Sequence, residues 1–113
     1  MPESDLLSSL ITELRRGALT LAVLSQLGGA QYGYSLLQRL EEKSTRIEAG
    51  TLYPLLRRLE AQGLLESRWD TAESRPRKYY IRSAYGQEIY EALKIEWRRL
   101  SAETDALLEE DSL

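Results

Sequence analysis

The chain has 113 residues, enough for one compact domain, and its 42% hydrophobic and 29% charged residues are an ordinary globular balance. It contains no His and no Cys, so the commonest general base, the thiol nucleophile and the best zinc ligands are all missing. We therefore expect neither an enzyme nor a bound cofactor or metal. The lack of a basic leader and of an apolar run of roughly 20 residues, together with the absence of cysteine, indicates a cytoplasmic protein that does not enter membranes.

The net charge of −3 is unevenly distributed along the chain. Residues 1–32 carry two basic and three acidic side chains, residues 33–82 carry ten and seven, and residues 83–113 carry three and eight. The middle segment is thus basic, by three charges, beside an acidic C-terminal segment. Such a segment could face a nucleic acid, although three excess charges are also commonly just a solvated surface.

The first helix is predicted over residues 5–27. Its apolar residues recur at steps of three and four, which is the spacing of one face of a helix. We expect a bend near Gly17, and the Gly28–Gly29 pair then stops the helix. A second, shorter helix is predicted over residues 33–43.

A loop, STRIEAG, separates the second helix from the third, and residues 46–47 within it are expected to be extended. The third helix is predicted from residue 50 or 51 to residue 62. Pro54 falls in its first turn, where a missing N–H costs nothing. Gly63 stands where a left-handed C-terminal cap is expected.

Two strands and a long helix complete the chain. The segments LLESRW and RKYYIR are rich in strand-forming residues and are separated by the polar loop DTAESRP, which predicts a two-stranded hairpin. A helix is predicted over residues 84–110. Its apolar stripe consists of Ile89, Leu93, Trp97, Leu100, Thr104 and Leu107.

This order of elements predicts a winged helix-turn-helix, a mostly α member of the α+β class with a long C-terminal dimerisation helix. We assign residues 1–83 to a winged-helix DNA-binding domain and residues 84–113 to the dimerisation helix. One small domain cannot cover the stripe of so long a helix, so a symmetric homodimer is expected. The predicted interface residues are Ile89, Leu93, Trp97, Leu100 and Leu107.

Double-stranded DNA is the expected partner. In helix-turn-helix proteins the N-terminal residues of the second helix of the pair face the base edges, and basic wing residues usually contact the backbone or the minor groove. Hydroxyl groups at the start of the third helix can bond phosphates or bases. The candidates on these two elements are Thr51, Leu52, Tyr53, Arg57, Arg75, Arg77 and Lys78.

Each candidate also has a purely structural interpretation. Tyr53 could pack against the core, Thr51 could only cap the helix, and Arg57 could pair with a nearby glutamate. Arg77 and Lys78 could be ordinary solvated charges at the head of a strand, although their clustering with the wing-loop arginine favours a compact basic tip.

The chain resembles the PadR family in the order and spacing of LRRGALTLAVLSQL, YGYSLLQRLE, GTLYPLLRRLEAQGLLES and RPRKYY, followed by Gly86. The resemblance runs from about Leu14 to Leu108. It implies a bacterial winged-helix regulator that dimerises through its C-terminal helix, and many such regulators repress transcription until a small molecule releases them. It also implies that Tyr34, in addition to the residues above, contacts DNA.

The resemblance has two departures, and it suggests one further role. The chain has a single C-terminal helix, as in the short subfamily, whereas longer members carry a bigger helical domain. Arg82 occupies a position that is usually aliphatic in the family, and we expect its side chain to extend outward. Some drug-sensing members stack planar molecules on a Trp of the C-terminal helix, which implies that Leu93 and Trp97 bind a small aromatic ligand. The favoured structural interpretation of Trp97 is a place in the dimer core. Trp69 is expected to pack within the hairpin.

The sequence therefore predicts a transcription regulator, specifically a repressor that binds a palindromic operator as a homodimer and is released by a planar hydrophobic molecule. The alternative is a winged helix used only as a protein-interaction module, which the acidic net charge favours. An enzyme is a third class, and the missing His, Cys, phosphate-binding loop and paired carboxylates argue against it.

Overall fold

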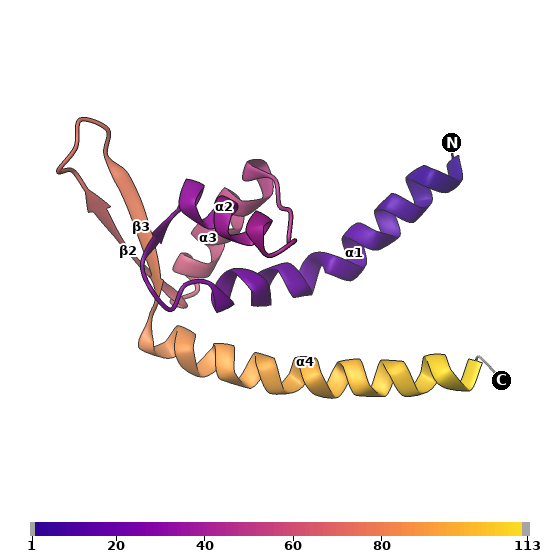
Figure 1. The fold of residues 1–113 in the computed structure, drawn as a ribbon. Coiled ribbons are helices and arrows are strands. Elements are labelled where there is room, and N and C mark those ends of the chain that lie inside the picture. Colours follow the sequence, from indigo (N-terminus) through magenta and orange to yellow (C-terminus); the bar gives the residue numbers. More distant parts are fainter. Residues whose placement is uncertain (1, 112–113) are drawn as a thin grey trace.

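A computed structural model describes residues 2–111, with side chains from residue 5 onward (Figure 1). In chain order the elements are α1 (Pro2–Ser25), β1 (Gln31–Tyr32), α2 (Gly33–Glu42), α3 (Ala49–Ala61), β2 (Leu65–Asp70), β3 (Arg77–Arg82) and α4 (Ala84–Asp111). Within this part of the chain, none of the helices combines the length and apolarity needed to cross a membrane. Residue 1 and residues 112–113 lie outside the described residues. They are the outer ends of the two segments assigned from the sequence, residues 1–83 and 84–113.

A leucine-rich core joins the C-terminal part of α1 to α2, α3 and the base of the sheet. Its members lie at helical steps of three and four, so each helix contributes one face, and burying each leucine contributes about 2 kcal/mol. The buried residues are Val23, Leu24, Leu27, Leu36, Leu40, Leu52, Leu55, Leu56, Leu59, Leu64, Leu65 and Tyr80. After α3 the chain turns at Gly63, whose φ of +82° confirms the predicted left-handed cap.

The sheet has three antiparallel strands in the order β1-β3-β2, whereas the sequence predicted only the hairpin of β2 and β3. The hairpin register, with Ser67 opposite Tyr80, leaves one edge of β3 free for β1. Tyr32 of β1 pairs with Tyr79, and their rings meet edge to face at 5.4 Å between centroids. A two-residue strand beside a glycine pair has no alternation to detect, which explains the omission.

The start of α3 differs from the prediction, whereas α1 is continuous through Gly17 and its axis bends along its length (Figure 1). Residues 46–47 belong to the irregular segment before α3, as expected for a loop, and Ile47 packs against the core. The turn before α3 uses Ser44 at a φ of +64°, and α3 begins at Ala49, so Thr51 lies inside the helix and is not its N-cap.

The start of α4 is fixed tightly to the end of α3. The Oγ of Ser83 accepts a hydrogen bond from the Gly86 N–H at 2.9 Å and donates one to the Gly63 carbonyl at 2.7 Å. A Cβ at position 86 would lie 1.9 Å from the carbonyl oxygen of Leu64, so only glycine fits there. This close approach sets where the long helix leaves the domain.

Arg82 does not extend outward as predicted. Its Nη1 donates to the Leu24 carbonyl at 2.6 Å, its Nε donates to Oε1 of Gln87 at 2.9 Å, and its guanidinium lies 4.4 Å from the centre of the Tyr90 ring. Because α1 has no basic residue in its last turn, Arg82 supplies the cation that a helix C-terminus favours. The arginine thereby joins β3 to both long helices.

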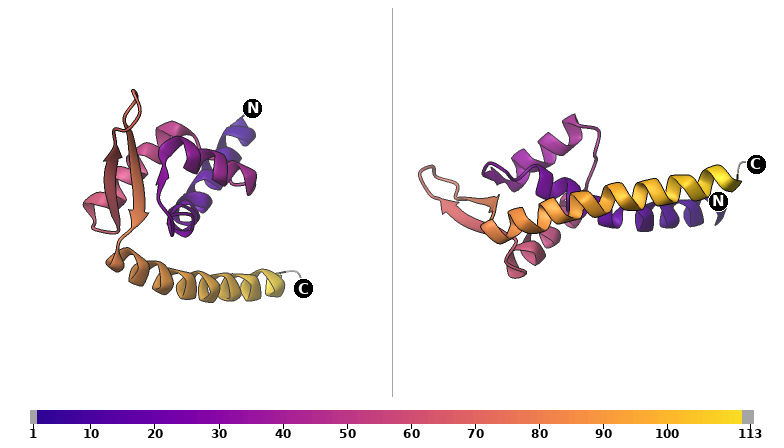
Figure 2. Two further views of the ribbon diagram at one scale, coloured as in Figure 1. Left: turned by 60° about the vertical axis from the view of Figure 1, so that its left-hand side comes forward. Right: turned by 90° about the horizontal axis from the view of Figure 1, so that it is seen from below.

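The two long helices diverge from this junction. Figure 1 and Figure 2 show α1 and α4 running away from the sheet in the same general direction, close at first and separated at their far ends. Their outer halves therefore extend beyond the winged-helix core, which gives the chain its extents of 60 × 38 × 24 Å.

Candidate functional site

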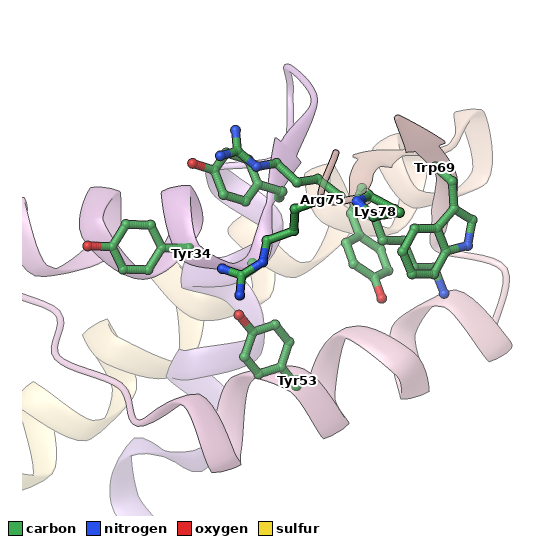
Figure 3. Close-up of a pocket in the computed structure, with 10 residues that line it drawn as sticks. Tyr34, Tyr53, Trp69, Arg75 and Lys78 are labelled. Atoms are coloured by element: carbon green, nitrogen blue, oxygen red, sulfur yellow. The ribbon is translucent and has the colours of Figure 1, made fainter. Parts of the chain in front are cut away.

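A groove separates the start of α2 and α3 from the β2–β3 hairpin, which forms the wing (Figure 3). It has a volume of about 640 Å³. Arg75 from the wing loop and Tyr53 from α3 reach toward one another across it. Its lining residues are Tyr32, Gly33, Tyr34, Tyr53, Trp69, Arg75, Pro76, Arg77, Lys78 and Tyr80.

Tyr53 owes its position to Gly33. A Cβ at residue 33 would lie 2.1 Å from Cε1 of the tyrosine ring and 2.6 Å from its hydroxyl. The ring therefore packs directly on the backbone at the start of α2 while its outer part stays accessible, with 38% of the residue exposed. Tyr34 is also exposed, and its hydroxyl accepts a hydrogen bond from Nε2 of Gln38 at 3.3 Å.

The helical phase of α3 decides which of its predicted residues can contact a ligand. Leu52 is fully buried, so its predicted contact with DNA is wrong for the side chain. Tyr53 and Arg57 are exposed, one turn apart, and Tyr53 lies next to the wing. Thr51 is exposed as well, but it lines a separate hollow on the side of α3 that faces α1. Tyr53 therefore lines the groove beside the wing, whereas Thr51 does not.

The basic residues of the wing do not form one tip. Arg77 lies over the Tyr32 ring, with 4.6 Å from Cζ to the ring centre, and pairs with Glu73 at 3.8 Å. Electrostatic attraction to Tyr32 is the main reason why the pKa of Arg77 is raised. Arg75 has no ion pair within residues 5–111 and is exposed, so its charge is the most available of the three.

Lys78 belongs to a network that ties the wing to α3. Its Nζ donates to Oε1 of Glu60 at 3.1 Å, and Oε2 of Glu60 accepts a short hydrogen bond from Ser67 of β2. The Ser67 hydroxyl, helped by the Lys78 ammonium, lowers the pKa of Glu60 despite the opposing effect of partial burial. The hydrogen bond to Glu60 in turn raises the pKa of Lys78. Lys78 therefore has a structural partner that Arg75 lacks.

Trp69 is a groove residue that the sequence did not indicate. We expected it to pack within the hairpin, yet it is 60% exposed and lines the groove opposite α3. It pairs across the strands with Lys78, so both side chains stand on the same face of the sheet. That face could have been found from strand alternation only if the hairpin register had been known.

The side chains of this groove suit a ligand that carries anionic groups and sugars. Hydroxyl groups, aromatic faces and guanidinium groups suit phosphate, deoxyribose and base edges. Among residues 5–111 no group of three or more potential metal-binding side chains gathers, and the groove contains no paired carboxylates.

A second feature is the apolar side of α4. Exposure rises steadily along the predicted stripe, from 37% at Leu93 through 54% at Leu100 to 66% at Leu107. Ile89 differs, because it is half-buried against the core of its own chain. The uncovered stripe therefore begins at Leu93. On α1, the exposed large residues Leu6, Leu7, Leu10, Ile11 and Leu14 extend the apolar surface.

The predicted effector residues share one apolar groove between the two long helices. Leu93 and Trp97 of α4 face Leu14 and Leu21 of α1 across a hollow of about 250 Å³. Glu96 is the one charged residue among those that line it. Drug-sized pockets usually measure 300–1,000 Å³, so this groove is about the size of half a site.

Comparison with known proteins agrees with this arrangement. Residues 20–92 match the transcriptional regulator PadR-like family. A transcriptional regulator of Mycobacterium tuberculosis is 37% identical over 76 residues, covering 66% of this chain and 71% of that protein. The crystal structure of a PadR family transcriptional regulator from Eggerthella lenta, 47% identical, superimposes with a TM-score of 0.89 over 96% of this chain and 97% of that one. PadR of Bacillus subtilis in complex with operator DNA shares the fold, with a TM-score of 0.64 at 22% identity over 68% of this chain and 46% of that one.

Proposed function

Because the chain belongs to the PadR-like family of transcriptional regulators, we propose that it binds a palindromic operator as a homodimer and represses transcription. The observation that carries the proposal is the groove between α3 and the wing, where Tyr53 and Arg75 face each other. An α-helix fits the major groove of B-DNA, and a basic loop beside it meets the backbone.

In this proposal the exposed side of α3 enters the major groove and the wing follows the adjacent backbone. Arg57, exposed near the middle of that side, is suited to contact base edges, because an arginine can bond guanine with two hydrogen bonds. Arg75 contacts phosphate, and Tyr34 and Tyr53 offer hydroxyl groups to the same strand. Few other long polar side chains stand at the start of α3, so the shape of the DNA contributes to operator choice.

The homodimer forms through α4, the dimerisation helix, while the preceding residues act as the DNA-binding domain. The stripe from Leu93 to Leu107 is the supporting observation, since within the described part of the chain its exposure increases toward the end of α4. A two-fold axis between the α4 helices would direct two α3 helices to half-sites about one helical turn, or 10 base pairs, apart.

A planar hydrophobic molecule releases the dimer from DNA in this proposal. Two copies of the Leu93–Trp97 groove, joined at the two-fold axis, would reach about 500 Å³, within the usual range for drug-sized ligands. The Trp97 ring can stack on such a molecule, and Glu96 favours a cationic one.

DNA binding is tested by fluorescence anisotropy with labelled DNA from the region upstream of the gene. The wild type should prefer this DNA over a scrambled duplex, and Arg75→Gln should weaken binding of both duplexes. Arg98→Gln, which removes an exposed charge from α4, is the matched control and should bind like the wild type. A wild-type protein that binds no DNA even at low salt would refute the proposal and favour a protein-interaction module.

The dimer is tested by sedimentation equilibrium. Leu100→Asp introduces a charge into the exposed stripe and should yield monomers with an unchanged helical circular dichroism spectrum. Ala102→Asp introduces the same charge on the opposite side of α4 and should stay dimeric. Dimers that persist in Leu100→Asp would exclude the α4 interface.

A further inference from the structure

The side of α3 that faces away from the wing carries a second basic hollow. It measures about 430 Å³ and lies between α3 and the middle of α1. Arg16 of α1 and Arg58 of α3 both line it, together with Thr51 and Pro54. No acidic residue is among its lining residues.

The two arginines are free to bind an external anion. Both are exposed, and neither forms an ion pair with any side chain of residues 5–111. Lys78 on the wing side, by comparison, is already paired with Glu60. The hollow therefore offers two uncompensated positive charges at the flank of the helix.

Helix geometry relates this flank to the first groove. At 3.6 residues per turn, Thr51 and Arg58 lie about 150° around α3 from Tyr53. Tyr53 marks the edge that faces the wing, and Thr51 with Arg58 marks the edge that faces α1. Arg57 lies between these two edges. The exposed arc of α3 thus has cationic groups along both sides.

The dimensions of DNA match this arrangement. A helix with its side chains is about 10–12 Å wide and the major groove is about 12 Å wide, so an inserted helix has a phosphate backbone on each side. The wing would contact the phosphate backbone on one side of the inserted helix. The backbone on the other side would run past the side of α3 that faces α1.

We propose that Arg16 and Arg58 bind backbone phosphates of the strand opposite to the one that the wing contacts. The inference rests on the proposed function, because it places a second strand on the same recognition helix. α1 then acts through two sides: Leu14 and Ala18 face α4, and Arg16, about 200° around the helix from Leu14, faces DNA.

The sequence offers a matched control in the neighbouring residue. Arg15 carries the same charge, is also exposed, and lies about 100° around α1 from Arg16, outside the hollow. A contact that depends on position rather than on total charge must distinguish Arg16 from Arg15.

The experiment measures the salt dependence of DNA binding by the full-length protein. Each phosphate contact contributes about 0.9 to the slope of log K against log salt, so the R16Q/R58Q variant should lower the slope by about 1.8 per bound protomer. R16K/R58K keeps both charges and should retain most of the slope. R15Q should keep the wild-type slope, and all variants should unfold at the wild-type temperature.

The outcomes separate the inference from the proposed function. If the wild type binds DNA and R16Q/R58Q keeps the wild-type slope, the phosphate contacts on the side of α3 that faces α1 are refuted and the operator-binding proposal stands. The same holds if R15Q lowers the slope by about 0.9, the amount expected for one phosphate contact. If the slope of R16K/R58K falls as far as that of R16Q/R58Q, contacts of residues 16 and 58 with phosphate are also refuted. If the wild type shows no salt-dependent DNA binding, both proposals fail.

Discussion

The substitution Gly86→Ala tests how α4 is held on the domain. The new Cβ would lie 1.9 Å from the Leu64 carbonyl oxygen, whereas carbon and oxygen normally approach to about 3.3 Å, so the helix must shift by about 1.4 Å. Such overpacking costs about 1–3 kcal/mol. The same shift pulls the Gly86 N–H from the Ser83 hydroxyl, and loss of such a cap costs about 1 kcal/mol. We expect a total loss of about 3 kcal/mol in the free energy of unfolding.

The assay is thermal unfolding followed by circular dichroism, with every variant at the same protein concentration because the Tm of a dimer depends on it. A loss of about 3 kcal/mol should lower the Tm by about 12 °C in a chain of this size. Gly17→Ala is the control, since nothing lies within 4 Å of its new Cβ, and it should raise stability by about 0.5–1 kcal/mol. If Gly86→Ala unfolds at the wild-type temperature, the close approach of α4 to Leu64 is not a constraint.

Three further substitutions test the cap, the wing network and the ligand groove. Ser83→Ala removes the hydroxyl that binds the Gly86 N–H, and chemical denaturation should show a loss of about 1 kcal/mol, while no loss would argue against the cap. Glu60→Gln should destabilise the protein at neutral pH. Because the lowered pKa of Glu60 means that its ionised form stabilises the fold, the difference from the wild type should shrink below pH 4.5, and a pH-independent difference would contradict this role. In a Trp69→Phe background, acridine orange should quench the remaining Trp97 fluorescence saturably, and a linear response would count against stacking in the groove.

The helices and the hairpin could be predicted because their signals are local. Steps of three and four define α2, α3 and α4, and Gly63 marks the turn that it indeed forms. The same periodicity places Leu52 with the core leucines, so the sequence itself indicates the burial that the structure shows. The two-residue β1 has no periodicity and becomes visible only through its pairing with β3.

Residues whose role depends on distant partners could not be interpreted from the sequence. Lys78 appears as a free wing charge until the fold brings Glu60, 18 positions away, to 3.1 Å. Arg82 appears as a polar residue in an apolar position until the Leu24 carbonyl and the Tyr90 ring surround it. The exposure of Trp69 requires the hairpin register, which a seven-residue loop does not determine.

Hydroxyl-radical footprinting of the DNA upstream of the gene tests most directly whether the chain binds an operator as a symmetric dimer. The account predicts two protected patches of equal size, related by two-fold symmetry and centred about one helical turn, or 10 base pairs, apart. Protection of a single asymmetric patch would contradict the dimer, and no protection at low salt would contradict operator binding itself.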